Sequence, residues 1–369
     1  MFRRIAALAR KEFLALLKDK KSRFTIIIPP IIQLLVFGYA ATYDLSNVPI
    51  AIYDEDHSMA SRDLVARFTG SPNFQVVARL NDDERIKTLI DNKEVVFLLH
   101  IHPQLGKNLL TGRSGNIQVI LDGRNSNTAM VALTYVRAIV TTFNLDWARA
   151  HGGTGPPARL TVRSWYNANL ESRWFIVPGI VGLLTLVVTM LVTALSVARE
   201  REQGTFDQLL VTPMRPFEIL IGKAIPGFVI GTAEASLIII ITVFWFGVPL
   251  RGHVVELYAG LFLFLLSAIG IGLMISSLSV TQQQGLLGTF LFLTPAIILS
   301  GFTTPIANMP TVVQKLTFLN PLRYFMVVIR GVFLEDAPLR LLLSQYWPMA
   351  LIGITCLTLA GWLFRHRIN

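Results

Sequence analysis

The stretch AREREQGTFDQLLVTPM, residues 198–214, lies between two long apolar segments of the chain. Its charged residues make it too polar for the interior of a bilayer. Its large apolar residues, Phe206, Leu209 and Leu210, recur at the three- and four-residue spacing of one helix face. We therefore predict an amphipathic helix at the cytoplasmic membrane surface, interrupted at Thr212 and Pro213 because proline cannot continue a helix.

The composition of the chain is that of a membrane protein. Hydrophobic residues make up 53% of its 369 residues and charged residues 15%, and the mean hydropathy is +0.55. Soluble domains do not combine these values, so several membrane spans are expected. Cys356 is the only cysteine, so no disulfide can form within the chain.

The charges are unevenly distributed. Residues 44–173 hold 14 of the 33 Lys and Arg residues and 13 of the 23 Asp and Glu residues, as expected for a folded aqueous domain. Its near balance of charge argues against nucleic acid as a partner. Eight Lys and Arg residues precede Phe24, and such a cluster beside a span is the signal of a cytoplasmic segment.

Six spans are expected, at residues 24–43, 174–197, 224–248, 257–278, 286–302 and 346–364. The paired prolines Pro29 and Pro30 should kink the first span or delay its start. Residues 1–23 resemble an amphipathic helix in the membrane interface. The segment 309–340 is semi-polar and broken, so we expect short helices that re-enter the outer leaflet. An even number of spans places both termini in the cytoplasm and residues 44–173 outside it.

Within residues 44–173, strand and helix patterns alternate. Strands are expected at 48–53, 74–80, 95–101 and 117–121, and helices at 59–69, 82–91 and 127–150. This alternation favours an α/β domain with a mostly parallel or mixed sheet, and the apolar strand 95–101 should be central. The predicted fold is therefore an all-α six-span membrane bundle with an inserted extracytoplasmic α/β domain.

One acidic residue lies deep within a predicted span. Glu234 falls near the middle of the span 224–248, where a carboxylate costs at least about 2.5 kcal/mol and is by default functional. It could line a cargo path and attract cations, bond to a polar side chain of another span, or relay protons. Gln33 in the first span is a weaker candidate with the same alternatives. The Gly227-to-Gly231 spacing favours close packing of helices within the chain.

Other candidate chemistry is weak. His100 and His102 alternate on one predicted strand and could share a face, but with His57 they lack a second ligand cluster, so no metal site is expected. Residues 54–56 are better explained by turn and capping chemistry. No Gly-x-x-x-x-Gly-Lys-Ser/Thr sequence occurs, so the chain should not bind ATP through a P-loop, and no cofactor of its own is expected.

The stretch that opens this section resembles the coupling segment of ABC-2 type ABC transporter permease subunits. The resemblance covers nearly the whole chain, including the segments 48–58, 119–126, 246–252 and 319–323, and is closest to the multidrug and ion exporters with a large periplasmic insert between the first two spans. The residues matching the family's coupling motif are Glu202, Gly204, Thr205, Asp207, Leu209, Thr212 and Pro213. We expect Gly204 to permit a tight helix start, and Thr205 and Asp207 to supply oxygen and charge to its first turn.

The resemblance implies the permease subunit of an ATP-driven exporter of the bacterial inner membrane, which moves a small drug-like or cationic molecule, or an ion, outward by alternating access. ATP and Mg would be bound by a partner ATPase, present in two copies. A second permease subunit, identical or a sister chain, membrane lipid and a periplasmic adaptor complete the implied partners.

Two other classes of function remain open. A membrane-anchored extracytoplasmic sensor would need no ATPase, and its coupling segment would be incidental. An ion-coupled secondary transporter using Glu234 would fail when the proton gradient collapses and would survive ATP depletion; it often carries inverted repeats, which this sequence does not show.

Overall fold

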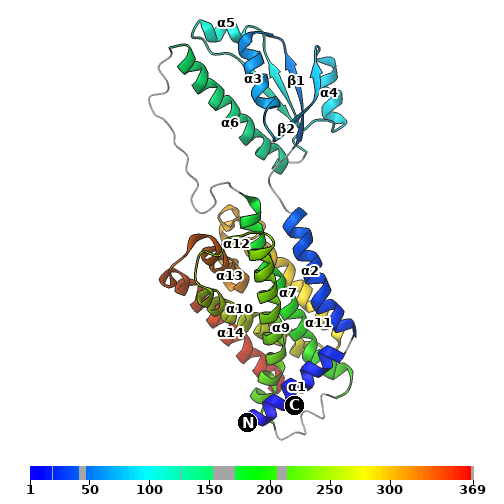
Figure 1. Ribbon diagram of the computed structural model, residues 1–369. Helices are drawn as coiled ribbons and strands as arrows, with labels where there is room; N and C mark the ends of the chain where they lie inside the picture. The colour runs from blue at the N-terminus through cyan, green and yellow to red at the C-terminus, as the bar shows by residue number, and fades with distance from the viewer. Residues whose placement is uncertain (19, 41–46, 125, 153–170, 206–213, 367–369) are drawn as a thin grey trace. The chain divides into compact units, whose positions relative to one another are not determined.

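The chain divides into two compact units in the computed structural model (Figure 1). The model describes residues 1–366 apart from 19, 41–46, 125, 153–170 and 206–213. The helical unit comprises Met1–Ala41 and Ser164–Asn369, and the α/β unit comprises Thr42–Arg163.

The α/β unit is built on a four-stranded mixed sheet. Its strands are β1 (Val48–Asp54), β2 (Phe74–Leu80), β3 (Phe97–Ile101) and β4 (Ile117–Leu121), in the order β2-β1-β3-β4. Strand β1 runs parallel to both β2 and β3, whereas β4 is antiparallel to β3. The expected mixed sheet and the interior position of β3 are confirmed. Every residue of β3 is buried, as its apolar sequence requires of a strand covered on both faces.

Helices cover both faces of this sheet (Figure 1). Helices α3 (Met59–Thr69) and α6 (Ser126–Ala150) bury Leu64, Phe68 and Phe143 against one face, together with Ile50 of β1. Helix α4 (Glu84–Asp91) buries Leu89 against the other face. All three helices were predicted. The six-residue helix α5 (Leu105–Leu110) was not, because it is too short to develop a periodic pattern.

The helical unit is organised around one long helix, α7 (Ser172–Glu202). Its neighbours are α2 (Lys20–Ala40), α9 (Pro216–Phe244), α10 (Val254–Leu278) and α11 (Gln282–Ile298). Helix α14 (Leu339–His366) packs against α10, and α1 (Phe2–Lys18) packs against α9. Since α7 is surrounded, its apolar residues are buried on every side, which explains why it shows almost no amphipathic pattern.

Among the described residues, five helices are long and apolar enough to cross a membrane, or six if one sharply bent pair counts as a single span. One of the five is α6, whose apolar stripe instead packs on the sheet of the α/β unit. Two predicted spans are shorter: α11 has 17 residues, and the apolar part of α2 is Ile27–Tyr39. Helix α2 begins at Lys20 and runs through Pro29 and Pro30, so of the two expectations for these prolines the delayed start is wrong and the kink stays a prediction.

The segment predicted as broken, 309–340, forms several short helices. It contains α12 (Thr311–Leu316), the 3-10 turn η2 (Thr317–Leu319), α13 (Pro321–Arg330) and the π-helical turn η3 (Gly331–Glu335), after the turn η1 (Ile306–Asn308). The chain bends by 85° between Leu319 and Pro321. Asn320 stabilises this bend, because its side chain accepts the N–H of Leu322 and donates to the carbonyl of Ala296 at 2.7 Å.

Two glycines of α9 bring this helix close to α7. A Cβ added to Gly231 would lie 2.4 Å from the Oγ1 of Thr189, and one added to Gly227 would lie 2.5 Å from the Cγ2 of Thr193. The glycine pair therefore serves packing within the chain, as the sequence favoured.

Gly231→Ile should lower the thermal stability of the purified protein in detergent. The new side chain must displace Thr189 or separate α7 from α9, and such overpacking typically costs about 1–3 kcal/mol. Val229→Ile is the matched control, because Val229 lies on the same helix and is 45% exposed. Equal melting temperatures for the two variants would contradict the close α7–α9 contact.

Candidate functional site

The predicted coupling segment joins the end of α7 to the start of α9. Phe206, Asp207, Leu209, Leu210, Thr212 and Pro213 lie outside the described residues. Glu202 is the last residue of α7, and its carboxylate accepts the N–H of Gln282, in the first turn of α11, at 2.8 Å. A carboxylate is favoured at this position by the partial positive charge of a helix N-terminus. The described end of the segment is therefore fixed against α11.

Gly204 ends helix α7. It follows the C-cap of α7 with φ of +67°, in the left-handed region, and its N–H bonds to the carbonyl of Arg201 at 3.1 Å. The N–H and hydroxyl groups of Thr205 both donate to the carbonyl of Glu200. This is the usual way in which glycine ends a helix. The helix that was expected to start after Gly204 lies outside the described residues.

A buried cluster of charged side chains joins both flanks of the segment to α1. The Nζ atom of Lys223, in α9, lies 2.7 Å from Oε1 of Glu12 and 2.6 Å from Oε2 of Glu200. Ser196 of α7 donates to Glu12, and Lys11 pairs with Glu200 at 2.9 Å. We call these five residues the Lys223 cluster. With Lys11 and Lys223 charged and both carboxylates ionised, its formal charges cancel.

The buried charges of this cluster would cost free energy if they were left unpaired. The Lys223 side chain is completely buried, and those of Glu12 and Glu200 are 8% and 7% exposed. Charges removed from water are retained only when they are paired and hydrogen-bonded. The positions of α1, α7 and α9 are therefore coupled, so that none of these helices can move away without leaving a buried charge unpaired.

The sequence analysis missed this cluster. It began the predicted span at residue 224 and so left Lys223 outside it, but α9 begins at Pro216 and includes Lys223 in its buried part. One signal was available in the sequence: Glu12 interrupts the buried stripe of α1 between Leu8 and Leu16, each four residues away. A charge within an apolar helix stripe suggests a buried partner.

Glu234 lines a cavity of about 260 Å³ between α1, α2 and α9. The residue is 9% exposed, and neither of its carboxylate oxygens has a hydrogen-bond partner within the described parts of the chain. The described residues thus provide no partner for the interhelical bond considered above. The cavity lining is otherwise almost entirely apolar, with Arg23 as the other charged residue. Gln33 is exposed on α2 and does not line this cavity.

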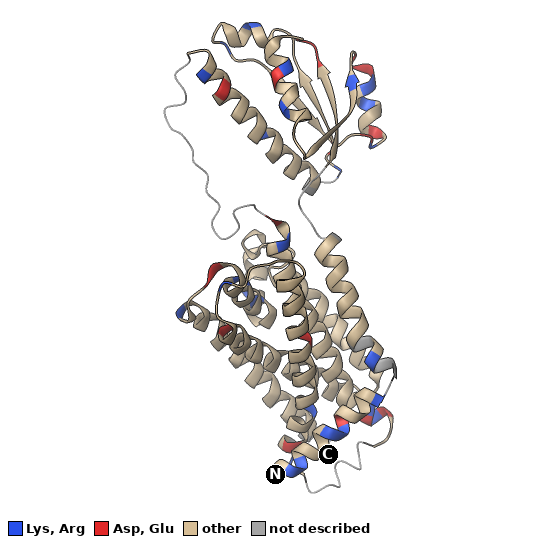
Figure 2. Ribbon diagram, in the orientation of Figure 1, with Lys and Arg blue, Asp and Glu red and all other residues tan. Residues whose placement is uncertain are grey.

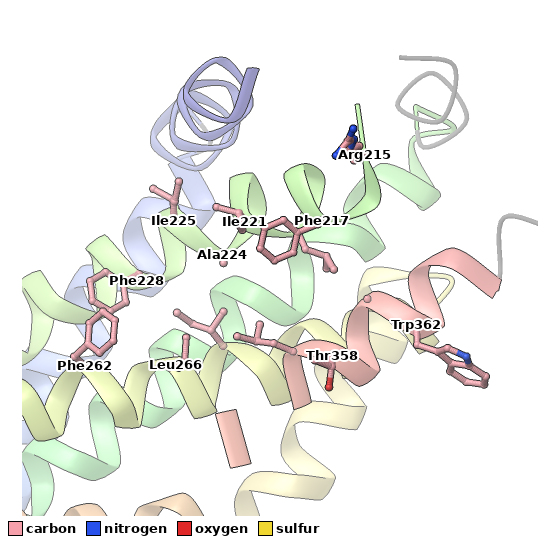
Figure 3. Close-up of a pocket in the computed structure, with 14 residues that line it drawn as sticks. Arg215, Phe217, Ile221, Ala224, Ile225, Phe228, Phe262, Leu266, Thr358 and Trp362 are labelled. Carbon is pink, nitrogen blue, oxygen red and sulfur yellow. The ribbon is translucent and has the colours of Figure 1, made fainter. Parts of the chain in front are cut away.

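A larger cavity, of about 740 Å³, lies between α9, α10 and α14. Figure 3 shows Phe217 and Phe228 of α9, Phe262 and Leu266 of α10, and Thr358 of α14 around it, with Arg215 at its edge. Its lining includes no carboxylate. This cavity can therefore accept apolar matter, whereas the Glu234 cavity of the same helical unit also offers a carboxylate to a cation.

Charged residues of the helical unit lie mainly toward the ends of its long helices. Figure 2 shows Lys and Arg around α1 and near the two chain ends. The middles of the long helices carry few charged residues. The Lys223 cluster belongs to the region around α1, because it joins α1 to the end of α7 and the start of α9. The arrangement is that of helices with apolar middles and a polar interface at their ends.

Asp54 has the turn chemistry predicted from the sequence. Its Oδ1 accepts the N–H groups of Asp56 and His57, and Ser58 caps α3 by accepting the N–H of Ser61. Glu55 differs, because its side chain bonds to Tyr53 and His100 rather than to the turn. The hydrogen bond from His100, followed by that from Tyr53, lowers the pKa of Glu55 below its usual range, and the bond to Glu55 raises the pKa of Tyr53 to about 12.

This architecture defines a multi-helix membrane protein with an added α/β unit. The family description for ABC-2 family transporter proteins matches residues 20–362, and the chain belongs to this family. It is 39% identical to the probable multidrug ABC transporter permease YbhR of Escherichia coli over 370 residues, covering 100% of both chains. It is 33% identical to the probable multidrug ABC transporter permease YbhS of the same organism, over 96% of each chain.

A more distant relative is the linearmycin resistance permease protein LnrN of Bacillus subtilis. The identity is 20% over 347 residues, which cover 88% of this chain and 89% of LnrN. The family resemblance drawn from the coupling segment is thus confirmed, and the relatives align along almost the full length of the chain.

Lys223→Met should strongly destabilise the helical unit. The substitution leaves Glu12 and Glu200 buried without their shared cation, and breaking a buried ion pair costs roughly 3–5 kcal/mol. Thermal unfolding in detergent would measure the loss. Lys11→Met is the control, because Lys11 is 54% exposed and its pair with Glu200 should contribute at most about 1 kcal/mol. Similar melting temperatures for both variants would show that the buried cluster does not hold the helices together.

Proposed function

We propose that this chain is the permease subunit of an ATP-driven exporter. Its family membership and its alignment with permeases named for multidrug and linearmycin resistance support this function. The absence of a P-loop from the sequence fits a subunit that obtains its energy from a separate ATPase, which would bind ATP and Mg. The localisation proposed is the bacterial inner membrane.

The observation that carries the mechanism is the Lys223 cluster. The coupling segment leaves the end of α7 and returns to the chain at α9, and the cluster joins these two helices and α1 through one buried ammonium group. A force applied to the segment by an ATPase would therefore act on α1, α7 and α9 together. Rigid transmission of this force suits alternating access, in which groups of spans move as rigid bodies.

The links from α7 to α10 and α11 extend this coupled group. Arg201 donates to the carbonyl of Ser277, in the last turn of α10, at 2.8 Å, and to that of Ser279, just beyond the end of α10, at 3.1 Å. Glu202 holds the first turn of α11. In the proposed mechanism, movement of the coupling segment would reach these helices through the same short stretch of α7.

The cargo we propose is a lipophilic cation. The Glu234 cavity combines an apolar lining with one carboxylate that has no donor among the described residues. Such a site would bind the apolar body of an amphiphilic cation and pair with its charge. Gln33 remains a secondary candidate, which could meet cargo at the exposed face of α2.

The proposed assembly contains two permease subunits, identical or sister chains, and two ATPase subunits within membrane lipid. Six spans, with residues 309–340 re-entering the outer leaflet, would place both termini and the segment 198–223 in the cytoplasm. Residues 44–173 would then lie in the periplasm, where the α/β unit could receive cargo or contact an adaptor. The membrane-anchored sensor and the ion-coupled transporter remain the alternatives to be tested.

Gly204→Val should weaken ATPase binding by the permease. A β-branched residue is disfavoured at φ of +67° by about 1–2 kcal/mol, so the segment would leave α7 in another direction and bind the ATPase roughly 5- to 30-fold more weakly. The assay is copurification with the cassette ATPase that wild type retains from native membranes. Gly112→Val is the control, because Gly112 has φ of +70° but lies in the α/β unit.

Phe206→Asp provides a second test of the same segment, since it replaces a predicted apolar contact by a charge. ATPase binding should be lost while the melting temperature is retained. If wild type binds no cassette ATPase in detergent or in native membranes, the exporter proposal is wrong, and the sensor and ion-coupled alternatives take its place.

Glu234→Gln should reduce ATP-dependent efflux of lipophilic cations about tenfold, with little effect on neutral compounds. The substitution keeps the side-chain volume and removes the charge, and tenfold corresponds to about 1.4 kcal/mol of lost cation binding. Leu237→Met, in the same cavity lining, is the control. Unchanged transport of every cationic compound would exclude Glu234 from the cargo path. Transport that survives ATP depletion and stops without a proton gradient would instead favour the ion-coupled alternative.

A further inference from the structure

The register of the sheet in the α/β unit brings three metal-ligating side chains together. Tyr53 of β1 lies opposite His100 of β3, so the residues two positions further along, Glu55 and His102, follow the same alignment. Side chains alternate between the faces of a strand, so all four residues point to the face covered by α4. The group lies at the carboxyl end of parallel strands, where α/β sheets commonly bind ligands.

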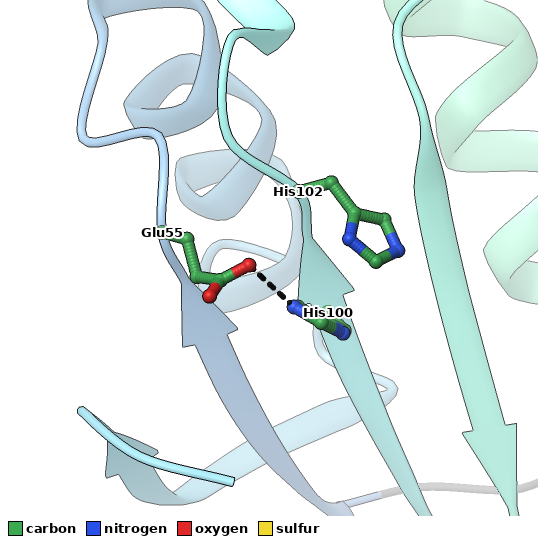
Figure 4. A group of neighbouring side chains, drawn as sticks. All are labelled: Glu55, His100 and His102. Carbon is green, nitrogen blue, oxygen red and sulfur yellow. Dashed lines mark hydrogen bonds and ion pairs between the residues drawn. The ribbon is translucent and has the colours of Figure 1, made fainter.

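The three candidate ligands are close to one another. One donor atom each from Glu55, His100 and His102 lies within 4.8 Å of the other two. The Nε2 of His100 is 2.9 Å from Oε2 of Glu55, and the His100 and His102 rings lie 4.1 Å apart between centroids, as Figure 4 shows. A tetrahedral zinc ion with bonds of about 2.0 Å needs ligand atoms roughly 3.3 Å apart, which rotation of the His102 side chain would provide.

The surroundings of these side chains suit a bound ion. The second carboxylate oxygen of Glu55 accepts the hydroxyl of Tyr53 at 2.9 Å, and the Tyr53 ring stacks on His100. Such partners fix the orientation of metal ligands. The Glu55 side chain is 31% exposed and that of His100 11%. His100 also lines an open cavity of about 480 Å³ together with Asp83, Asp91 and Lys87, which opens its imidazole to solvent.

We propose that Glu55, His100 and His102 form a binding site for a divalent transition-metal ion, with Zn²⁺ as its ligand. Two imidazoles and one carboxylate are a donor set that Zn²⁺ accepts in sites with an open fourth position, whereas Mg²⁺ and Ca²⁺ prefer oxygen ligands alone. The ion replaces the hydrogen bond between His100 and Glu55 and joins the end of β1 to the end of β3. This site does not depend on the proposed export function.

The sequence alone favoured no metal site, because it offered only two alternating histidines. His57, the third histidine considered there, is exposed in the turn before α3, with φ of 49°, and is not part of the group. The missing ligand, Glu55, comes from a strand 45 residues earlier in the chain. Only the parallel pairing of β1 with β3 places it beside the histidines.

The test is zinc titration of the full-length protein in detergent, purified without a polyhistidine tag and treated with chelator. Calorimetry with ZnCl₂ should give one site per chain, and His100→Gln, His102→Gln and Glu55→Gln should each weaken binding at least about tenfold. His57→Gln is the matched control and should bind as wild type does. Co²⁺ bound in the same site should give the visible absorption of a four-coordinate ion, and His102→Gln should abolish it.

A folding readout separates lost binding from lost structure. Zn²⁺ should raise the melting temperature of wild type and of His57→Gln, reversibly with EDTA, and should leave that of His102→Gln unchanged. The variant His102→Gln is expected to fold, because its side chain is only half-buried. The proposal is overturned if folded His102→Gln and Glu55→Gln bind Zn²⁺ as tightly as wild type, or if wild type binds none.

Discussion

An ammonium group without access to water determines how three helices of this protein meet. Lys223 requires anionic partners, and it finds them on α1 and α7, whose Glu12 and Glu200 are themselves almost fully buried. Each of these three charges makes the burial of the other two tolerable, so Lys223, Glu12 and Glu200 are stable in this position only together. The same residues flank the segment that is proposed to contact an ATPase. In the proposed mechanism, structural stability and force transmission would therefore depend on one set of side chains.

Several hydroxyl groups along the long helices are satisfied within their own helix, and Glu234 differs from them. The hydroxyls of Thr193, Thr242 and Thr289 each donate to the carbonyl four residues earlier in the same helix. Glu234 has no such arrangement among the described residues, and its carboxylate faces an apolar cavity instead. A buried acid without a donor lowers stability, and this cost is the reason for proposing that Glu234 binds cargo.

Secondary structure was largely predictable because each unit has a clear periodicity. In the α/β unit, three of the expected helices and all four strands occur within about two residues of their predicted positions, since apolar residues alternate with a period of 2 or 3.6. In the helical unit, the long apolar runs predicted where the helices lie, but they did not predict the residues at which the helices begin and end. Helix α9 begins eight residues before the predicted span, because its first turns bury polar side chains against other helices.

The sequence by itself determined the class of protein and its family, because hydropathy and a long linear motif do not depend on distant contacts. It also identified Glu234 as unusual, since a carboxylate is rare in an apolar helix. Tertiary structure alone decided which charges meet. Lys223 lies 211 residues from Glu12 in the chain, and His100 lies 45 residues from Glu55. Helix packing and strand register create these neighbours, and neither can be read from spacing along one segment.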